Sequence, residues 1–82
     1  MNTNKLNAWF RLALEEDQQE FNCFVKTEIM PTDEQKTELI SLGCRHIINQ
    51  IFTATLTREN VGKVSDLDYV RYLELSRPLH PC

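Results

Sequence analysis

The sequence is poor in the residues that build phosphate loops, crosslinks and membrane spans. Its 82 residues include two glycines, three prolines, three cysteines and two histidines. Gly43 and Gly62 are far apart, which excludes a glycine-rich phosphate loop. No stretch approaches the ~18 apolar residues of a membrane-spanning helix. We therefore expect neither a nucleotide-binding loop nor a membrane partner.

Cysteine and histidine are too scattered for a metal site. His46 and His80 are distant in sequence, and no Cys-x-x-Cys pair accompanies them. Because structural zinc needs about four closely spaced N or S ligands, we expect no metal and no cofactor. The odd, widely spaced Cys23, Cys44 and Cys82 indicate thiols in a reducing compartment. The apolar neighbours of Cys23 and Cys44 predict core positions for both.

Catalysis is also disfavoured. Cys44 and His46 are two apart on a predicted strand, so they face the same way and could pair as nucleophile and base. No third group orients this pair, and Glu15 and Glu16 lie at a helix end with no implied pocket. A chain this short has no room for the cleft that most enzymes use. We expect that the protein is not an enzyme.

The charge pattern argues against a nucleic-acid partner, because the formal net charge is −3. The densest acidic stretch, Glu15, Glu16, Asp17 and Glu20, is either a solvated helix end or a contact for a basic partner. The segment from Met1 to Leu6 lacks the basic and apolar blocks of a signal peptide, which predicts a cytoplasmic protein.

Hydrophobic periodicity predicts the first two elements. Residues 4–17 indicate an amphipathic helix, and residues 21–29 indicate a strand. The helix has apolar side chains at helical spacing, namely Leu6, Trp9, Phe10, Leu12, Ala13 and Leu14. The strand alternates apolar with polar residues, although Phe24 interrupts the alternation. Pro31 then ends the strand.

Turn and capping signals predict the remaining elements. Thr32 and Gln35 have the spacing of a capping box, and Gly43 is suited to end the helix that runs to Leu42. We expect this helix to bury Leu39, Ile40 and Leu42. Strands over 44–48 and 51–56 flank the hairpin turn Asn49-Gln50. Thr57 caps a helix over 58–66 that buries Val61, Val64 and Leu67, and residues 69–75 form the last strand.

This order predicts an α+β protein, a ferredoxin-like βαββαβ sandwich with an extra N-terminal helix. In that fold, two split βαβ halves give a four-stranded antiparallel sheet with two helices on one face. We divide the chain into the helix at 1–19, the domain at 20–76 and an extended tail at 77–82. The N-terminal helix could pack on the domain or contact a partner.

The predicted sheet has one face without helices. That face is half apolar and carries aromatic residues, which is typical of a binding surface. Its candidate docking residues are Phe24, Lys26, Thr53, Thr55, Tyr72 and Glu74, with Ile51 beside them. Phe24 and Tyr72 could instead stack RNA bases, but the acidic balance disfavours this. The tail could be an unstructured C-terminus or a peptide that enters a partner's cleft.

The chain resembles the propeptides of subtilisin-type serine proteases over roughly residues 20–79. The run from Leu56 to Leu79 is similar to their last helix, strand and tail, with Val70, Leu73, Glu74, Ser76, Arg77, Pro78 and Leu79 at the matching places. Phe24-Val25-Lys26 resembles their first strand, and Leu42-Gly43 resembles their helix end.

The resemblance implies a protein that binds, inhibits or assists the folding of a subtilisin-like protease. Family members place the open sheet face on two protease helices, whose N-termini are capped by acidic residues, and lay the C-terminal tail in the substrate cleft. Tyr72 and Glu74 would then lie at the docking face. Leu79, His80, Pro81 and Cys82 would enter the cleft, with Cys82 in the primary specificity pocket.

The chain departs from the propeptide family in two ways, and both affect the function that we expect. A propeptide continues into its protease, whereas this chain ends at Cys82, so we expect a separate inhibitor or companion. Without an export signal, its protease would be intracellular. The alternatives are a general protein-interaction module that uses the same face in a complex or homodimer, and a single-stranded RNA binder.

Overall fold

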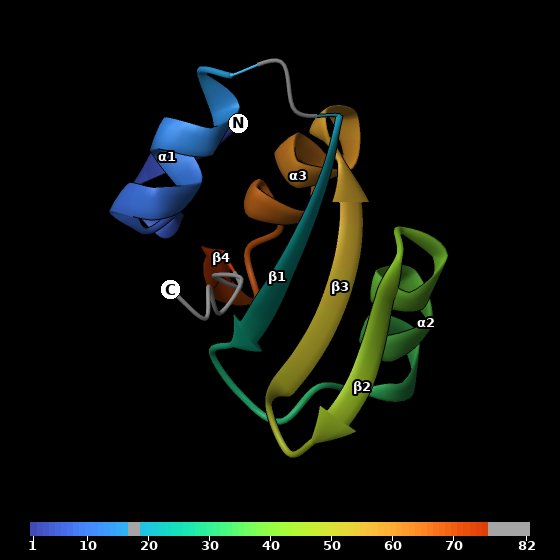
Figure 1. The fold of residues 1–82 in the computed structure, drawn as a ribbon. Coiled ribbons are helices and arrows are strands. Elements are labelled where there is room, and N and C mark those ends of the chain that lie inside the picture. Colours follow the sequence, from blue (N-terminus) through green and yellow to red (C-terminus); the bar gives the residue numbers. More distant parts are fainter. Residues whose placement is uncertain (17–18, 76–82) are drawn as a thin grey trace, which may run out of the picture.

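The structure is a computed structural model that describes residues 1–16 and 19–75. Within these residues the protein is α+β, with one four-stranded antiparallel sheet and three α-helices (Figure 1). The strand order is β2-β3-β1-β4. The strands are β1 (Glu20–Thr27), β2 (Cys44–Ile48), β3 (Ile51–Thr57) and β4 (Val70–Leu75). The helices are α1 (Ala8–Leu14), α2 (Asp33–Ser41) and α3 (Arg58–Ser65), after a short 3₁₀ turn, η1 (Thr3–Lys5).

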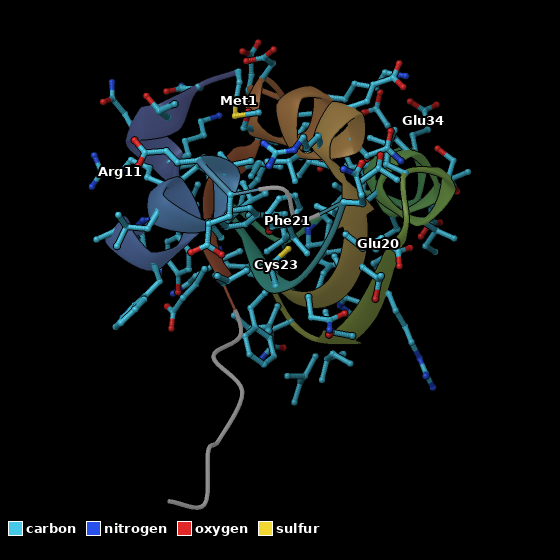
Figure 2. All side chains as sticks on the ribbon, turned by 45° about the horizontal axis from the view of Figure 1, so that its top comes forward. Met1, Arg11, Glu20, Phe21, Cys23 and Glu34 are labelled. Atoms are coloured by element: carbon cyan, nitrogen blue, oxygen red, sulfur yellow. The ribbon has the colours of Figure 1, made fainter. Side chains whose placement is uncertain are left out.

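The core lies between the sheet and the helices, as the alternating pattern predicts. Helices α2 and α3 cover the same side of the sheet (Figure 1). On the two central strands, every second side chain is buried against them: Phe21, Cys23 and Val25 on β1, and Phe52, Ala54 and Leu56 on β3. Figure 2 shows Phe21 and Cys23 in the interior. The period of two therefore assigns these strands to the core correctly.

The hairpin prediction is confirmed. Asn49 and Gln50 separate β2 from β3, and Asn49 has a φ of 48°, a left-handed conformation that asparagine tolerates. Gln50 also holds the end of β1, since its backbone carbonyl accepts from the Thr27 N–H and its side-chain amide donates to the Thr27 carbonyl. The turn thus fixes β1 as well as its own two strands.

Both predicted helix caps are confirmed. The Thr32 hydroxyl accepts a hydrogen bond from the Gln35 N–H at 3.2 Å, and the Gln35 side chain accepts one from the Thr32 N–H at 3.0 Å. Thr57 caps α3 by accepting from the Asn60 N–H at 3.2 Å. These bonds satisfy donors that a helix start leaves unpaired, so the starts of α2 and α3 are well defined by the sequence.

The predicted helix over residues 4–17 is wrong at its start. Leu6 is extended and forms a parallel bridge with Leu73 on the outer edge of β4, and α1 begins only at Ala8. Asn7 ends the extended stretch, because its side chain accepts from the Phe10 N–H at 3.0 Å and from the Leu75 N–H at 3.3 Å. Pairing with the free backbone of β4 outweighs helix propensity at Leu6. Residues 17 and 18 lie outside the described residues.

Two further predictions need correction. The prediction that α2 buries Ile40 is wrong, because Ile40 is 56% exposed, whereas Leu39 is fully buried and Leu42 is half-buried. Neighbouring helix residues point about 100° apart, so with Leu39 turned to the sheet Ile40 points away from it. The first strand ends at Thr27, before Ile29, because the Thr27 hydroxyl closes a turn onto the Ile29 carbonyl at 2.6 Å.

The N-terminal helix packs on the domain, which answers the question left open by the sequence. Phe10 is fully buried, and its ring stacks on Phe21 at a centroid distance of 5.4 Å. The Arg58 guanidinium lies 5.5 Å from the centre of the Phe21 ring and donates to the carbonyls of Leu14 and Glu16 at the end of α1. Arg58 therefore joins α1, the start of β1 and the start of α3.

The first five residues tie the same segment to the far end of α3. Lys5 donates to the Leu67 carbonyl at 2.7 Å, and the Asn2 N–H donates to the buried Ser65 hydroxyl at 3.0 Å. The Met1 ammonium lies 3.5 Å from the Asp66 carboxylate. The positive charges of Met1 and Lys5 thus lie at the C-terminal end of α3, where the helix dipole favours cations.

The two glycines give a matched test of the fold. Gly43 has a φ of +109°, and a Cβ there would come 2.7 Å from the Thr55 carbonyl oxygen, whereas a Cβ on Gly62 would meet only the Met1 side chain at 3.9 Å. We expect Gly43→Ala to lower the free energy of unfolding by about 1–3 kcal/mol. Gly62→Ala should raise it by about 0.5–1 kcal/mol, because alanine favours a helix interior. Urea denaturation measures both, and equal effects would contradict the assigned conformations.

Candidate binding face

The six candidate docking side chains share the side of the sheet that the helices leave open, which we call the open face. The register places Phe24 of β1 between Thr53 of β3 and Glu74 of β4. Lys26 lies beside Tyr72 on β4 and beside Ile51 on β3. Thr55 lies next to Asn22 and donates to its side-chain oxygen at 3.0 Å.

The open face combines an exposed ring with both signs of charge. Phe24 is 43% exposed and lies on one of the two central strands. Glu74 is exposed beside it, and Lys26 and Tyr72 are half-buried. An aromatic centre with polar groups around it has the composition of a protein-binding surface. How the face is used remains a prediction.

Strand β2 extends this face, although none of its residues is among the predicted docking residues. Arg45 pairs with Thr53 and Ile48 pairs with Ile51, so both belong to the open face, and Ile48 is 59% exposed. The pleat of a hairpin would have indicated this, because paired residues point to the same side. The adjoining Ile47, at a register shift in β2, is 54% exposed.

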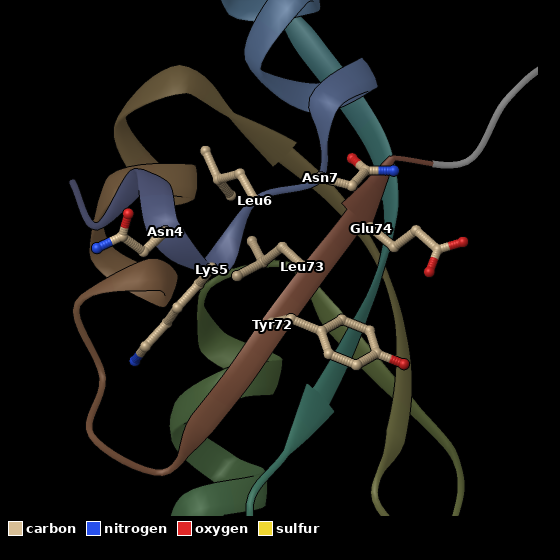
Figure 3. A pocket seen from close by; sticks show the side chains of 7 residues that line it. All are labelled: Asn4, Lys5, Leu6, Asn7, Tyr72, Leu73 and Glu74. Atoms are coloured by element: carbon tan, nitrogen blue, oxygen red, sulfur yellow. The ribbon is translucent and has the colours of Figure 1, made fainter.

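A shallow hollow borders the open face at the opposite edge (Figure 3). Its volume is about 280 Å³, and its walls are η1 with the residues after it and β4. In Figure 3, Leu6 and Leu73 point toward each other, while Tyr72 and Glu74 project from the other side of β4. The N-terminal segment thus covers the edge of β4 without covering Tyr72 or Glu74.

The Cys44–His46 pair faces the helices rather than the open face. Cys44 is buried, and the His46 ring packs at 4.9 Å from the Phe52 ring while its Nε2 lies 2.8 Å from the Asn49 carbonyl oxygen. Burial raises the pKa of the Cys44 thiol to about 11. A nucleophilic cysteine needs a lowered pKa, so this geometry supports a core role for Cys44.

The two described cysteines flank the same residue of the core. Cys23 on β1 and Cys44 on β2 both pair with Ala54 on β3, and both are free thiols. Burial, and to a lesser degree the nearby Cys44, raises the pKa of Cys23 to about 12. Because a whole strand separates them, their Cα atoms are about two strand spacings, roughly 10 Å, apart, which is too far for a disulfide.

The described residues contain no group of three or more His, Cys, Asp or Glu side chains that could hold a metal ion. Glu15 and Glu16, which ended the predicted acidic helix, are exposed at the end of α1. The predicted cleft residues Leu79, His80, Pro81 and Cys82 lie outside the described part of the chain, as does Asp17.

Comparison of the chain with protein-family models, curated proteins and solved structures finds no match in any of the three. Likeness to subtilisin propeptides therefore remains a prediction from the sequence. Among residues 1–16 and 19–75, none of the helices has the length and apolar content that a membrane crossing needs.

The buried thiols predict how stability changes with pH. Their folded pKa values of about 12 and 11 lie above the ordinary value of 9.0, so the unfolded chain loses these protons first. Stability from the two neutral thiols is complete below about pH 9 and falls as the pH rises toward 11–12, by up to about 1.4 kcal/mol per pH unit for each thiol. Denaturation in urea between pH 8 and 11 measures this slope.

The double variant Cys23→Ala/Cys44→Ala should lose less unfolding free energy per pH unit above pH 9. This expectation holds whatever the variant's stability at pH 8. Burial and the hydrogen bond to Glu38 also raise the pKa of Tyr69, so Tyr69→Phe serves as the companion variant that removes the phenol's part. A slope unchanged by the double cysteine variant would show that the thiols are not held neutral in the folded protein.

Proposed function

We propose that the chain has the ferredoxin-like βαββαβ fold, with α1 and the segment before it added at the β4 edge. The strand order β2-β3-β1-β4 supports this proposal, since β1 and β3 are central and every neighbouring pair is antiparallel. The connections through α2 and α3 support it too, because both helices lie on one side of the sheet (Figure 1). Two interleaved βαβ halves give this order.

We further propose that the protein binds a subtilisin-like serine protease and inhibits it or assists its folding. One observation carries the proposal: Tyr72 and Glu74 lie on the open face, on the strand that leads directly into residues 76–82. A partner held on this face would have the following residues of the chain beside it. The same strand provides the sequence resemblance on which the choice of partner rests.

In this mechanism the sheet binds the protease and the tail blocks its substrate cleft. Phe24 and Tyr72 supply aromatic contact area, and the Glu74 carboxylate caps the N-terminus of a protease helix, where unpaired N–H groups carry partial positive charge. Residues Leu79 to Cys82 occupy the substrate cleft and exclude substrate. Binding energy from the sheet raises the local concentration of the tail at the cleft.

A second candidate function has its own support in the structure. Strand β2 is an edge of the sheet, and its last two residues, Ile47 and Ile48, are exposed. An exposed edge strand with apolar side chains can accept a strand from another protein. This favours a general protein-interaction module, in which β2 rather than the tail would carry the contact.

The test compares binding and inhibition of an intracellular subtilisin-like protease by four proteins: the unchanged chain, a chain ending at Ser76, Glu74→Ala and Lys63→Ala. Lys63 is exposed on α3, on the helix side, and serves as the matched control. We expect the shortened chain to bind without inhibiting. Glu74→Ala should weaken binding about tenfold or more, as for a central interface residue.

Calorimetric titration and hydrolysis of a peptide substrate measure the two effects separately. Inhibition that survives removal of residues 77–82 would contradict the tail mechanism. Equal binding by Glu74→Ala and Lys63→Ala would contradict docking through the open face. If neither change matters but Ile48→Asp abolishes capture of a partner, the interaction-module function replaces the proposal.

A further inference from the structure

A second groove lies where β4 ends, between that strand and α1. It has a volume of about 510 Å³ and is lined by Trp9, Leu12, Ala13, Glu15, Glu16 and Leu75. Trp9 and Leu12 are 48% and 54% exposed, although they belong to the helix that carries the buried Phe10. The groove therefore presents an apolar floor on the outer side of α1 and one wall of two carboxylates.

The acidic wall lies where a cation is favoured. Glu15 and Glu16 lie at the C-terminal end of α1, where helix carbonyls already concentrate negative charge. Arg58 offsets part of this by donating to the Leu14 and Glu16 carbonyls. Within residues 1–16 and 19–75, neither carboxylate forms an ion pair. A further cation in this groove would lower the electrostatic energy.

The chain itself supplies a segment with the matching chemistry. Leu75 lines the groove, and Ser76-Arg77-Pro78-Leu79-His80-Pro81-Cys82 follows it directly. Arg77 is two residues beyond Leu75, about 7 Å along an extended chain, and its side chain adds to that reach. The groove spans Trp9 to Glu16, about 10 Å of helix. Arg77 can thus reach the carboxylates, while Pro78 and Leu79 offer apolar surface to Trp9 and Leu12.

We propose that in the free protein residues 76–82 dock in this groove, with Arg77 against Glu15 and Glu16 and with Pro78 and Leu79 over Trp9 and Leu12. The prolines favour this mode of binding, because they limit the conformations that an unbound tail loses on docking. The groove is then an internal binding site that holds the tail when no partner takes it. This docking needs no protease, so it stands apart from the proposed function.

Trp9 is the only tryptophan in the sequence, so its fluorescence reports on this groove alone. The experiment measures acrylamide quenching of Trp9 in the isolated, unchanged chain and in the Arg77→Glu variant. Glu15→Lys with Glu16→Lys, alone and combined with Arg77→Glu, completes the set. Lysines at the end of α1 suit the helix, so these variants should remain folded. Arg45→Glu makes the same charge change on the exposed β2 edge and is the matched control.

We expect Arg77→Glu to raise the ratio of undocked to docked tail by about two- to fivefold, the range for an exposed ion pair. Trp9 should become correspondingly easier to quench. The variant that combines Glu15→Lys, Glu16→Lys and Arg77→Glu should return toward the quenching of the unchanged chain. The control Arg45→Glu should be quenched as much as the unchanged chain. Salt at high concentration should raise quenching of the unchanged chain toward that of Arg77→Glu.

Two results would overturn the inference. The first is identical quenching in the unchanged chain, Arg77→Glu and a chain ending at Leu75, which would show that the tail does not cover Trp9. The second is quenching that falls as protein concentration rises, which would show that a second copy of the chain fills the groove. Failure of the protein to bind a protease would not affect this inference, because no protease is present in the quenching measurement.

Discussion

The stack of Phe10 on Phe21 is the contact on which the placement of the other surfaces depends. A chain of 82 residues buries a smaller share of its surface than a larger domain does, so each large buried side chain matters. Phe10 comes from α1, outside the sheet and its two covering helices, yet it is as buried as Phe21 and Phe52. With Phe10 in place, α1 must lie beside β4, and the segment before it must follow the edge of that strand.

That constraint makes the two edges of the sheet unlike each other. Leu6 and Asn7 occupy the edge of β4, where the Asn7 N–H bonds to the Leu73 carbonyl at 3.4 Å and the Asn7 side chain accepts from Leu75. At the other edge, β2 has only five residues and a register shift between His46 and Ile48. Short length and irregularity are ordinary protections for an exposed edge. Both edges are therefore less available for strand pairing than a long, regular edge would be, and the open face is the broader surface for a partner.

The sequence predicted those features that local rules determine. The hairpin at Asn49, the stop at Gly43 and the cap at Thr32 depend on the chemistry of one or two residues, and each lies where it was expected. The face of each sheet residue followed from the period of two, which put Phe24 and Glu74 on one side. These parts need no knowledge of distant contacts.

What the sequence could not predict was determined by contacts between distant residues. Leu6 fits a helical stripe as well as it fits an edge bridge, and only the position of Leu73 decides between them. Ile40 belongs to an apolar helix end, but the helix lies against an edge strand that covers one line of side chains. The groove at Trp9 was missed for the same reason, since it needs α1 and the end of β4 side by side.

The two uses proposed for residues 76–82 are mutually exclusive, and that has a thermodynamic consequence. If a fraction f of the chains has an undocked tail, the apparent dissociation constant for a partner that needs the tail is the intrinsic constant divided by f. Docking on Trp9 and Leu12 thus lowers the affinity for the partner, while the open face, with Phe24 and Glu74, is unaffected by it. Binding through the sheet would come first and hold the complex together while the tail exchanges. The Phe10–Phe21 stack then affects binding indirectly, because it positions the groove that competes for the tail.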